Sequence, residues 1–160
     1  MITQDLVQEL FDYRDGYLYW RHKVNKRHGI DAPAGTVNSI GYRVITISGK
    51  KIQAHRLVWL WHGLDLPQQI DHINGNRCDN RMENLRAADC MTNAFNSKLK
   101  SDNTSGVKGV SWCNTYNKWI VQIHAFKRKV SGRFQSFDEA VAFAKQKRLE
   151  LHGSFANEGV

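Results

Sequence analysis

The sequence predicts an α+β protein built from small modules in series. Two stretches of alternating apolar and polar residues lie near the N-terminus, a strand, loop and helix pattern lies in the middle, and three strand-like stretches precede a helix near the C-terminus. We therefore expect an N-terminal β-rich module over residues 1–54 and a ββα module over residues 55–97. A linker over residues 98–105 then leads to a three-stranded antiparallel sheet with one helix over residues 106–160.

The N-terminal module begins with a short predicted helix around residues 4–11. Asp15-Gly16 is a strong turn signal, and the aromatic β-formers Tyr17–Trp20 follow it, which predicts a hairpin within residues 12–20. A second hairpin is predicted within residues 41–54, where apolar residues alternate on both sides of a Ser-Gly turn. Together these hairpins predict a small twisted sheet.

The middle module has a helix, a strand and a second helix in its pattern. An apolar stripe over residues 55–62 ends at Gly63, which predicts a short amphipathic helix. Residues 70–73 alternate as a strand, the Asn-Gly-Asn run that follows is typical of a turn, and a polar loop continues to Leu85. A second helix is expected over residues 89–96.

The C-terminal module has strand patterns at residues 107–112, 118–125 and 130–135, followed by a helix over residues 137–151. Ser136 and Glu139 form a capping-box pattern before that helix, and Gly153 is suited to its end. The preceding stretch KLKSDNTS is polar and rich in turn formers, which is typical of a linker.

Charge is distributed unevenly along the chain. The net charge is +8, with eight Lys/Arg against five acidic residues in 1–54, four against five in 55–96, and eleven against five in 97–160. Basic outer segments suit contacts with phosphates, so the module over residues 1–54 is expected to bind DNA as well, and a weakly acidic middle suits a bound cation. Generic surface charge would give the same totals, so the motifs decide between these interpretations.

Composition excludes several classes of protein. No apolar run approaches the roughly 20 residues of a membrane helix, and the acidic start MITQDLVQEL does not have the pattern of a secretory signal. The three cysteines are widely spaced, so they predict neither a disulfide framework nor a zinc-type pair. We expect a protein of the cytoplasm, in a prokaryote or a phage-infected host, with no obligate protein partner.

Asp71, His72 and Asn93 carry the chemistry expected of the middle module. A carboxylate and a carboxamide oxygen are hard ligands suited to one Mg²⁺ or Mn²⁺ ion. A histidine is largely neutral at pH 7 and can take a proton from water. If the strand and the following helix fold against each other, Asp71 and Asn93 would bind the cation, and His72 would activate water for phosphodiester cleavage.

The stretch DHINGNRCDNRMENLRAADCMTNAFN resembles the HNH nucleases, particularly those of phages and mobile introns. The resemblance implies a ββα-metal unit in which His72 is the general base, Asp71 and Asn93 are metal ligands, and Asn84 braces the loop. The third motif letter is Asn93 here in place of His, a departure familiar in the phage branch. The resemblance to HNH nucleases also implies a double-stranded DNA substrate. Whether the enzyme is a homing endonuclease stays open.

The stretch from Ser105 to Gly153 resembles the APETALA2-type DNA-binding domain, which phage HNH enzymes often carry. The resemblance implies that the sheet lies in the major groove and that the helix packs behind it. By motif position it also places five residues at DNA: Lys108, Ser111, Gln122, His124 and Arg128. Lys127, Arg128 and Lys129 form a basic hairpin cluster that is suited to phosphate contacts. Alternation agrees, since Trp119, Val121 and Ile123 would face the helix.

Other interpretations stay open at this stage. A non-catalytic, sequence-specific DNA-binding regulator with the same fold predicts binding without strand breaks, and an RNA-binding or RNA-cleaving module is a further alternative. Three residues are candidates for a supporting role at the site: His55, Asn80 and Asn96. His55 opens a helix and is expected to make a structural hydrogen bond. The target sequence and the choice between nicking and double-strand cleavage are not predicted.

Overall fold

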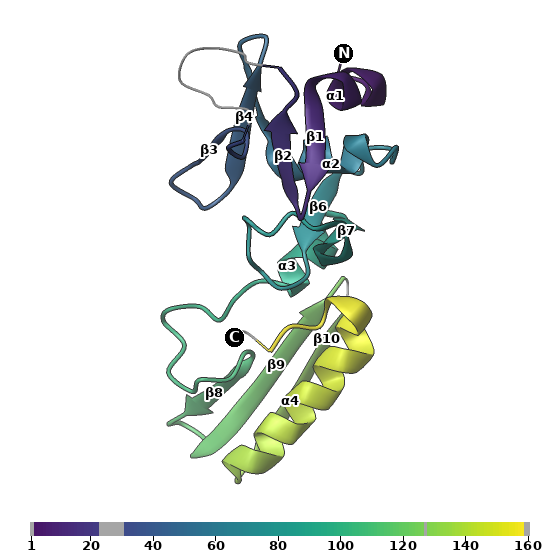
Figure 1. Cartoon of the computed structure of the whole chain (residues 1–160). Helices are drawn as coiled ribbons and strands as arrows, with labels where there is room; N and C mark the ends of the chain where they lie inside the picture. The colour runs from purple at the N-terminus through teal and green to yellow at the C-terminus, as the bar shows by residue number, and fades with distance from the viewer. Residues whose placement is uncertain (1, 23–30, 127, 159–160) are drawn as a thin grey trace. The chain divides into compact units, whose positions relative to one another are not determined.

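Antiparallel sheets of two or three strands and four α-helices form the α+β fold in the computed structural model, which describes residues 2–22, 31–126 and 128–158 (Figure 1). The chain divides into two compact units, Met1–Asp89 and Cys90–Val160. The α+β class predicted from the sequence is confirmed. None of the helices in these ranges is long and apolar enough to cross a membrane.

The first unit holds most of the small sheets. Its elements are α1 (Gln4–Leu10), β1 (Phe11–Arg14), β2 (Tyr17–Trp20), β3 (Thr36–Val37), β4 (Arg43–Ile47), β5 (Lys50–Gln53), α2 (Ala54–Trp61), β6 (Gln69–His72), the 3-10 helix η1 (Met82–Asn84) and β7 (Leu85–Ala88). Strands β1 and β2 form one hairpin, and β3, β4 and β5 form a sheet in that order. Strands β6 and β7 pair antiparallel, with Asp71 opposite Arg86 and His72 opposite Leu85.

Both predicted hairpins are present at the expected turns. Asp15 and Ser48 adopt positive φ, as do the glycines that follow them, which is the backbone geometry of tight hairpin turns. Strand β3 was not predicted, because its two residues are too short to show a period. Strand β7 was also missed, since the run Leu85–Ala88 has no alternation of apolar and polar residues.

One hydrophobic core joins the N-terminal hairpins to the strand that carries Asp71 and His72. The fully buried side chains Phe11, Leu18, Ile45 and Leu57 come from β1, β2, β4 and α2, and they belong to the same core as Ile70 on β6. Burying these side chains stabilises the unit by about 1.5–3 kcal/mol each. Residues 1–54 and the segment that carries Asp71 and His72 therefore share one core. That the two segments have separate functions stays a prediction.

The turn between β1 and β2 packs against the loop that follows β6. A Cβ atom added to Gly16 would lie 2.7 Å from the backbone nitrogen of Arg81 and 3.0 Å from the carbonyl carbon of Asn80. Gly16 also has a φ of +86°, which disfavours other residues. Only glycine lets the hairpin approach this loop so closely.

We expect Gly16→Ala to lower the free energy of unfolding more than Gly49→Ala does. Both glycines have positive φ, but no atom lies within 4 Å of a Cβ added to Gly49. Backbone strain therefore costs each alanine variant about 1 kcal/mol, and the steric clash costs about 1–3 kcal/mol more only in Gly16→Ala. Urea denaturation of both variants measures the difference. Equal losses would show that the hairpin is not pressed against the loop.

The second unit contains α3 (Cys90–Phe95), β8 (Val110–Cys113), β9 (Lys118–Ala125), β10 (Arg128–Phe134), α4 (Phe137–His152) and the 3-10 helix η2 (Gly153–Phe155). Strand β9 lies between β8 and β10, and both pairings are antiparallel. The Ser136 side chain accepts a hydrogen bond from the Glu139 backbone nitrogen at the start of α4. The strands, the helix and this cap were all predicted; β8 starts three residues later and β10 two residues earlier than predicted, and each ends within one residue of the prediction.

Helix α4 covers one face of the C-terminal sheet, as Figure 1 shows. Ala140 and Ala144 are fully buried there against Val121 and Ile123, which confirms the predicted alternation along β9. Arg148 continues the same helix face and is only 1% exposed. Its guanidinium donates to the Lys108 carbonyl and to the Glu158 carboxylate. Arg148 therefore links Glu158, near the C-terminus, to the segment that precedes β8.

Candidate functional site

The end of strand β6 places His72 in a buried polar environment. The His72 Nε2 atom lies 2.9 Å from the Asn80 Oδ1 atom, and the two residues are 4% and 1% exposed. Burial lowers the pKa of His72, against the Asn80 hydrogen bond and the nearby Asp71 and Asp79 charges, which raise it. A buried imidazole with a lowered pKa stays neutral near pH 7, which is the form that accepts a proton.

Asn84 holds both ends of the loop after β6. Its Oδ1 atom accepts a hydrogen bond from the Asn74 backbone nitrogen at 3.0 Å, and its Nδ2 atom donates to the Asp79 carbonyl at 2.7 Å. The Asn84 carbonyl also accepts from the Ile73 backbone nitrogen. These bonds are the kind that a bracing residue makes, because a buried side chain fixes two points of the loop backbone.

Further contacts fix this loop from inside and from the N-terminal sheet. The Asp79 carboxylate accepts hydrogen bonds from Arg81 and Asn74 at 2.8 Å, and the Arg81 bond is the main reason that the pKa of Asp79 lies well below its usual value. On the other side, Arg77 donates to the Ile40 carbonyl at 2.7 Å, and the Cys78 thiol donates to the Gly41 carbonyl. The loop is therefore held at both ends and from two hairpins.

Asp71 forms a close ion pair across the β6–β7 hairpin. The Arg86 Nη2 and Nε atoms lie 2.6 and 2.7 Å from the Asp71 Oδ2 atom. The Asp71 side chain is 7% exposed, and that of Arg86 is 16% exposed. A carboxylate at this position attracts positive charge and is a hard oxygen ligand, so its chemistry fits a Mg²⁺ or Mn²⁺ ion with water in its remaining positions. Arg86 was not among the residues singled out from the sequence.

His55 lies at the start of α2 and packs against His72. The two imidazole rings are perpendicular, with centroids 5.1 Å apart, and the Tyr42 ring lies 5.4 Å from His55 and 6.0 Å from His72. The Arg77 guanidinium lies over the Tyr42 ring at 4.9 Å. Burial, followed by the charges of His72 and Arg56, lowers the pKa of His55 to about 3. His55 is thus a neutral residue of the same site.

We expect His55 to make the first unit less stable as the pH falls. Its folded pKa of about 3 lies below the unfolded value of about 6.5, so stability present above pH 6.5 is lost as the pH falls toward 3. Between pH 7 and pH 5 the loss due to His55 is about 2 kcal/mol. His72, Arg56 and Tyr42 are the titratable or charged groups around it.

Urea denaturation followed by NMR signals of first-unit residues, at pH 7 and at pH 5, measures this loss. His55→Gln should reduce the difference between the two pH values by about 2 kcal/mol. His22→Gln is the matched control, because His22 is an exposed residue of the same unit. A His55→Gln protein with the wild-type pH dependence would show that His55 protonates freely in the folded state.

Two residues predicted for the nuclease site, Asn93 and Asn96, belong to the second unit. Asn93 lies on α3, so its expected role as a metal ligand rests on its place in the motif. Asn96 follows α3 and is 7% exposed, and its Oδ1 atom accepts a hydrogen bond at 2.7 Å from the Asn157 Nδ2 atom. Asn96 therefore holds the C-terminal end of the chain in this unit, a contact that the sequence did not indicate.

The sheet face opposite α4 carries four of the predicted DNA-contacting residues: Ser111, Gln122, His124 and Lys129, all exposed. In the strand register Gln122 pairs with Ser131 and His124 pairs with Lys129. Paired residues of antiparallel strands share a face, so Arg133, opposite Ile120, also belongs here. The Arg133 guanidinium lies 4.2 Å from the Tyr116 ring centre. Arg133 was not singled out from the sequence, although the alternation of Val130, Gly132 and Phe134 with Ser131 and Arg133 places it on this face.

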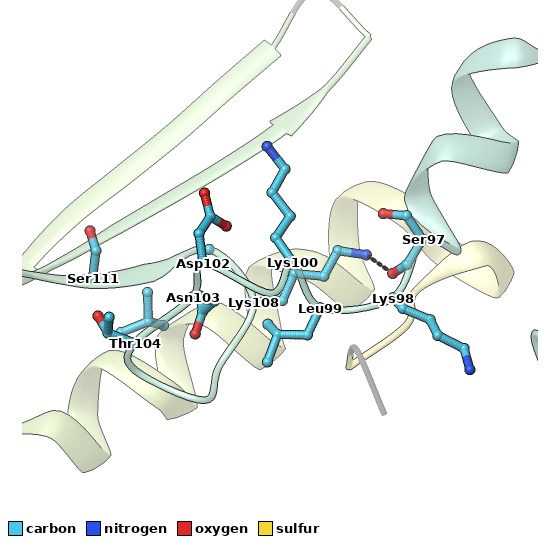
Figure 2. Close-up of a pocket in the computed structure, with 11 residues that line it drawn as sticks. Ser97, Lys98, Leu99, Lys100, Asp102, Asn103, Thr104, Lys108 and Ser111 are labelled. Atoms are coloured by element: carbon cyan, nitrogen blue, oxygen red, sulfur yellow. Dashed lines mark hydrogen bonds between the residues drawn. The ribbon is translucent and has the colours of Figure 1, made fainter.

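Arg128 and Lys108 occupy different positions from the other predicted contacts. Arg128 pairs with the buried Ala125, so alternation assigns it to the helix side of the sheet. The Lys108 Nζ atom donates to the Phe95 and Ser97 carbonyls at 2.9 and 2.6 Å. Figure 2 shows the Lys108 ammonium directed toward Ser97 in a pocket of about 310 Å³. Lys127 lies outside the described residues.

Lys108 therefore anchors the chain after α3 in this structure. Burial lowers the pKa of its ammonium, and the Arg148 charge adds to this shift.

In the described parts of the chain no group of three or more His, Cys, Asp or Glu residues is placed to hold a metal ion.

The buried strand-end histidine, the adjacent carboxylate and the asparagine-braced loop define a site of the HNH class. A family model described as HNH endonuclease matches residues 53–97, which include this site. Protein 3.8 of Escherichia phage T7 is 36% identical over 109 residues, which cover 67% of this chain and 90% of that protein. The chain belongs to the HNH endonuclease family. No solved structure matches it.

Proposed function

We propose that the protein is a metal-dependent endonuclease that hydrolyses phosphodiester bonds of double-stranded DNA. The observation that carries the proposal is the buried His72 at the end of β6, next to Asp71 and bonded to Asn80, within the segment matched by the HNH endonuclease model. A neutral, fixed imidazole beside a hard oxygen ligand supports general-base activation of water on a phosphate.

Each residue of the site has a distinct task in this proposal. His72 takes the proton of the attacking water, and Asn84 keeps the loop in place through the Asn74 and Asp79 backbones. Asp71 and Asn93 would hold one Mg²⁺ or Mn²⁺ ion, Asn93 by its place in the motif. When bound, such an ion stabilises the charge that develops on the phosphate and on the leaving 3′-oxygen. Arg86 orients the Asp71 carboxylate.

The C-terminal unit would hold the DNA. One face of its antiparallel sheet presents Gln122, His124, Lys129 and Arg133, and the segment 97–160 has eleven Lys/Arg against five acidic residues. Such a face supports phosphate contacts by the basic residues and base contacts by the amide and imidazole groups. The APETALA2-type character of this unit and a homing role, in the cytoplasm of a prokaryotic or phage-infected cell, are parts of the same proposal.

Incubation of the protein with supercoiled plasmid and Mg²⁺ or Mn²⁺ tests the activity. We expect conversion to nicked or linear DNA, and we expect EDTA to prevent it. Several plasmids should be used, because the target sequence is unknown. Intact plasmid in every metal-containing reaction, from protein that still binds DNA, would overturn the proposal.

A non-catalytic DNA-binding regulator is the second candidate function. The observation that favours it is the Arg86 guanidinium, which already neutralises the Asp71 carboxylate at 2.6 Å. This function predicts specific, salt-sensitive binding without strand breaks. The plasmid assay therefore separates the two candidates when it is combined with a binding measurement on the same DNA.

A further inference from the structure

Asn80 is a buried side chain that contacts the Nε2 atom of His72, and the surrounding loop leaves it little room to move. It is 1% exposed, and the Gly16 turn packs directly on its backbone and on that of Arg81. Its neighbour Asp79 is held by Arg81 and Asn74. The backbone that carries the Asn80 side chain is therefore held in place. A side chain on a fixed backbone can orient the imidazole ring that it contacts.

The contact assigns the protons of the His72 ring. A carboxamide oxygen only accepts hydrogen bonds, so the 2.9 Å contact between Asn80 Oδ1 and His72 Nε2 requires that Nε2 carry the proton. In the neutral ring the lone pair then lies on Nδ1. By accepting a hydrogen bond from Nε2, Asn80 thereby leaves Nδ1 as the nitrogen that can take a proton from water.

The packing of the ring makes this selection matter. His55 meets His72 at 90° and Tyr42 lies beside both, so the plane of the His72 ring is set by packing. Packing does not distinguish the ring from the same ring flipped by half a turn, since the two have nearly the same shape. A directional hydrogen bond does distinguish them.

We propose that Asn80 is a positioning residue that keeps His72 in the Nε2-protonated tautomer, with Nδ1 as the nitrogen that accepts the proton. The proposal rests on the proposed function for its catalytic consequence, but the tautomer itself exists without DNA. In the described parts of the chain the Asn80 Nδ2 atom is buried with no hydrogen-bond partner, so the contact to His72 is the hydrogen bond that accounts for a polar side chain at this position.

Long-range ¹H–¹⁵N NMR of the full chain labelled at histidine reads the tautomer directly. His72→Gln identifies the His72 signals by their loss, and the exposed His22 is the internal reference. We expect protonated Nε2 and unprotonated Nδ1 at His72 in the wild type. Asn80→Ala should give a mixture of tautomers. Asn80→Asp keeps an acceptor but adds a charge that raises the pKa of His72, so its spectrum is recorded at a pH high enough to keep the ring neutral, and there it should restore the wild-type form. Thermal unfolding shows whether each variant is folded.

The outcomes separate this proposal from the proposed function. A His72 with its proton on Nδ1 in the wild type overturns the proposal, and so does a folded Asn80→Ala protein with the wild-type tautomer. If Asn80→Ala does not fold, the wild-type and Asn80→Asp spectra decide. In cleavage, Asn80→Ala should lower the single-turnover rate about 10-fold or more while DNA affinity stays within about twofold. The expected tautomers in a protein that never cuts DNA would overturn the proposed function alone.

Discussion

Replacing His72 with alanine is expected to reduce metal-dependent DNA cleavage by at least about 100-fold, because a positioned general base contributes about that much or more. The change removes the ring that Asn80 and His55 hold in place. It removes no exposed charge, since His72 is 4% exposed, so DNA affinity should stay within about twofold. Single-turnover cleavage and equilibrium binding to the same duplex measure the two effects.

His22→Ala is the control for this experiment. His22 is an exposed histidine of the same unit, so its loss should leave the cleavage rate unchanged. A His72→Ala protein that is folded and cuts at the wild-type rate would show that the base lies elsewhere. Weaker DNA binding, in proportion to a slower rate, would instead make His72 a binding residue.

The second large effect is expected at Asp71. Asp71→Asn removes the negative charge of the predicted ligand, so cleavage should fall at least about 100-fold and Mn²⁺ affinity at least about 10-fold. It also leaves the guanidinium of Arg86 without its carboxylate at a site that is only 16% exposed. Loss of one partner of such a pair costs about 3 kcal/mol, so the free energy of unfolding should fall as well.

Arg86→Gln separates the two roles of Asp71. This variant also breaks the ion pair, and it lowers the free energy of unfolding, but it keeps the Asp71 carboxylate. We expect it to bind Mn²⁺ at least as tightly as the wild type, measured by titration of the folded protein followed by electron paramagnetic resonance. If Arg86→Gln and Asp71→Asn lose Mn²⁺ affinity equally, Asp71 acts through the ion pair and is not a ligand.

Local signals in the sequence predicted much of the fold. The Asp15-Gly16 turn and the alternation along β9 depend on residues that are close in sequence, and so does the Ser136 cap of α4. These features agree with the structure because backbone geometry and side-chain period determine them locally. The motif around His72 was also visible, because its residues are ordered along a short stretch.

The contacts around the site could not be predicted in the same way. His55 lies 17 residues before His72, and the perpendicular packing of their rings depends on how α2 meets β6 in a shared core. The expected structural hydrogen bond of His55 was a local interpretation, whereas the ring contact is tertiary. Arg86 becomes the partner of Asp71 only through the register of β6 and β7. Register also assigns Arg128 to the helix side.

Sequencing of the 3′ ends of cleaved DNA tests most directly the claim that the site around His72 hydrolyses phosphodiester bonds. The protein is incubated with duplex DNA and Mg²⁺ or Mn²⁺, and the ends are captured with and without prior removal of a 3′-phosphate. We expect metal-dependent ends that carry a free 3′-hydroxyl, since the 3′-oxygen is the leaving group, and we expect none with His72→Ala. Ends that carry a 3′-phosphate, or the same ends with His72→Ala, would contradict the account.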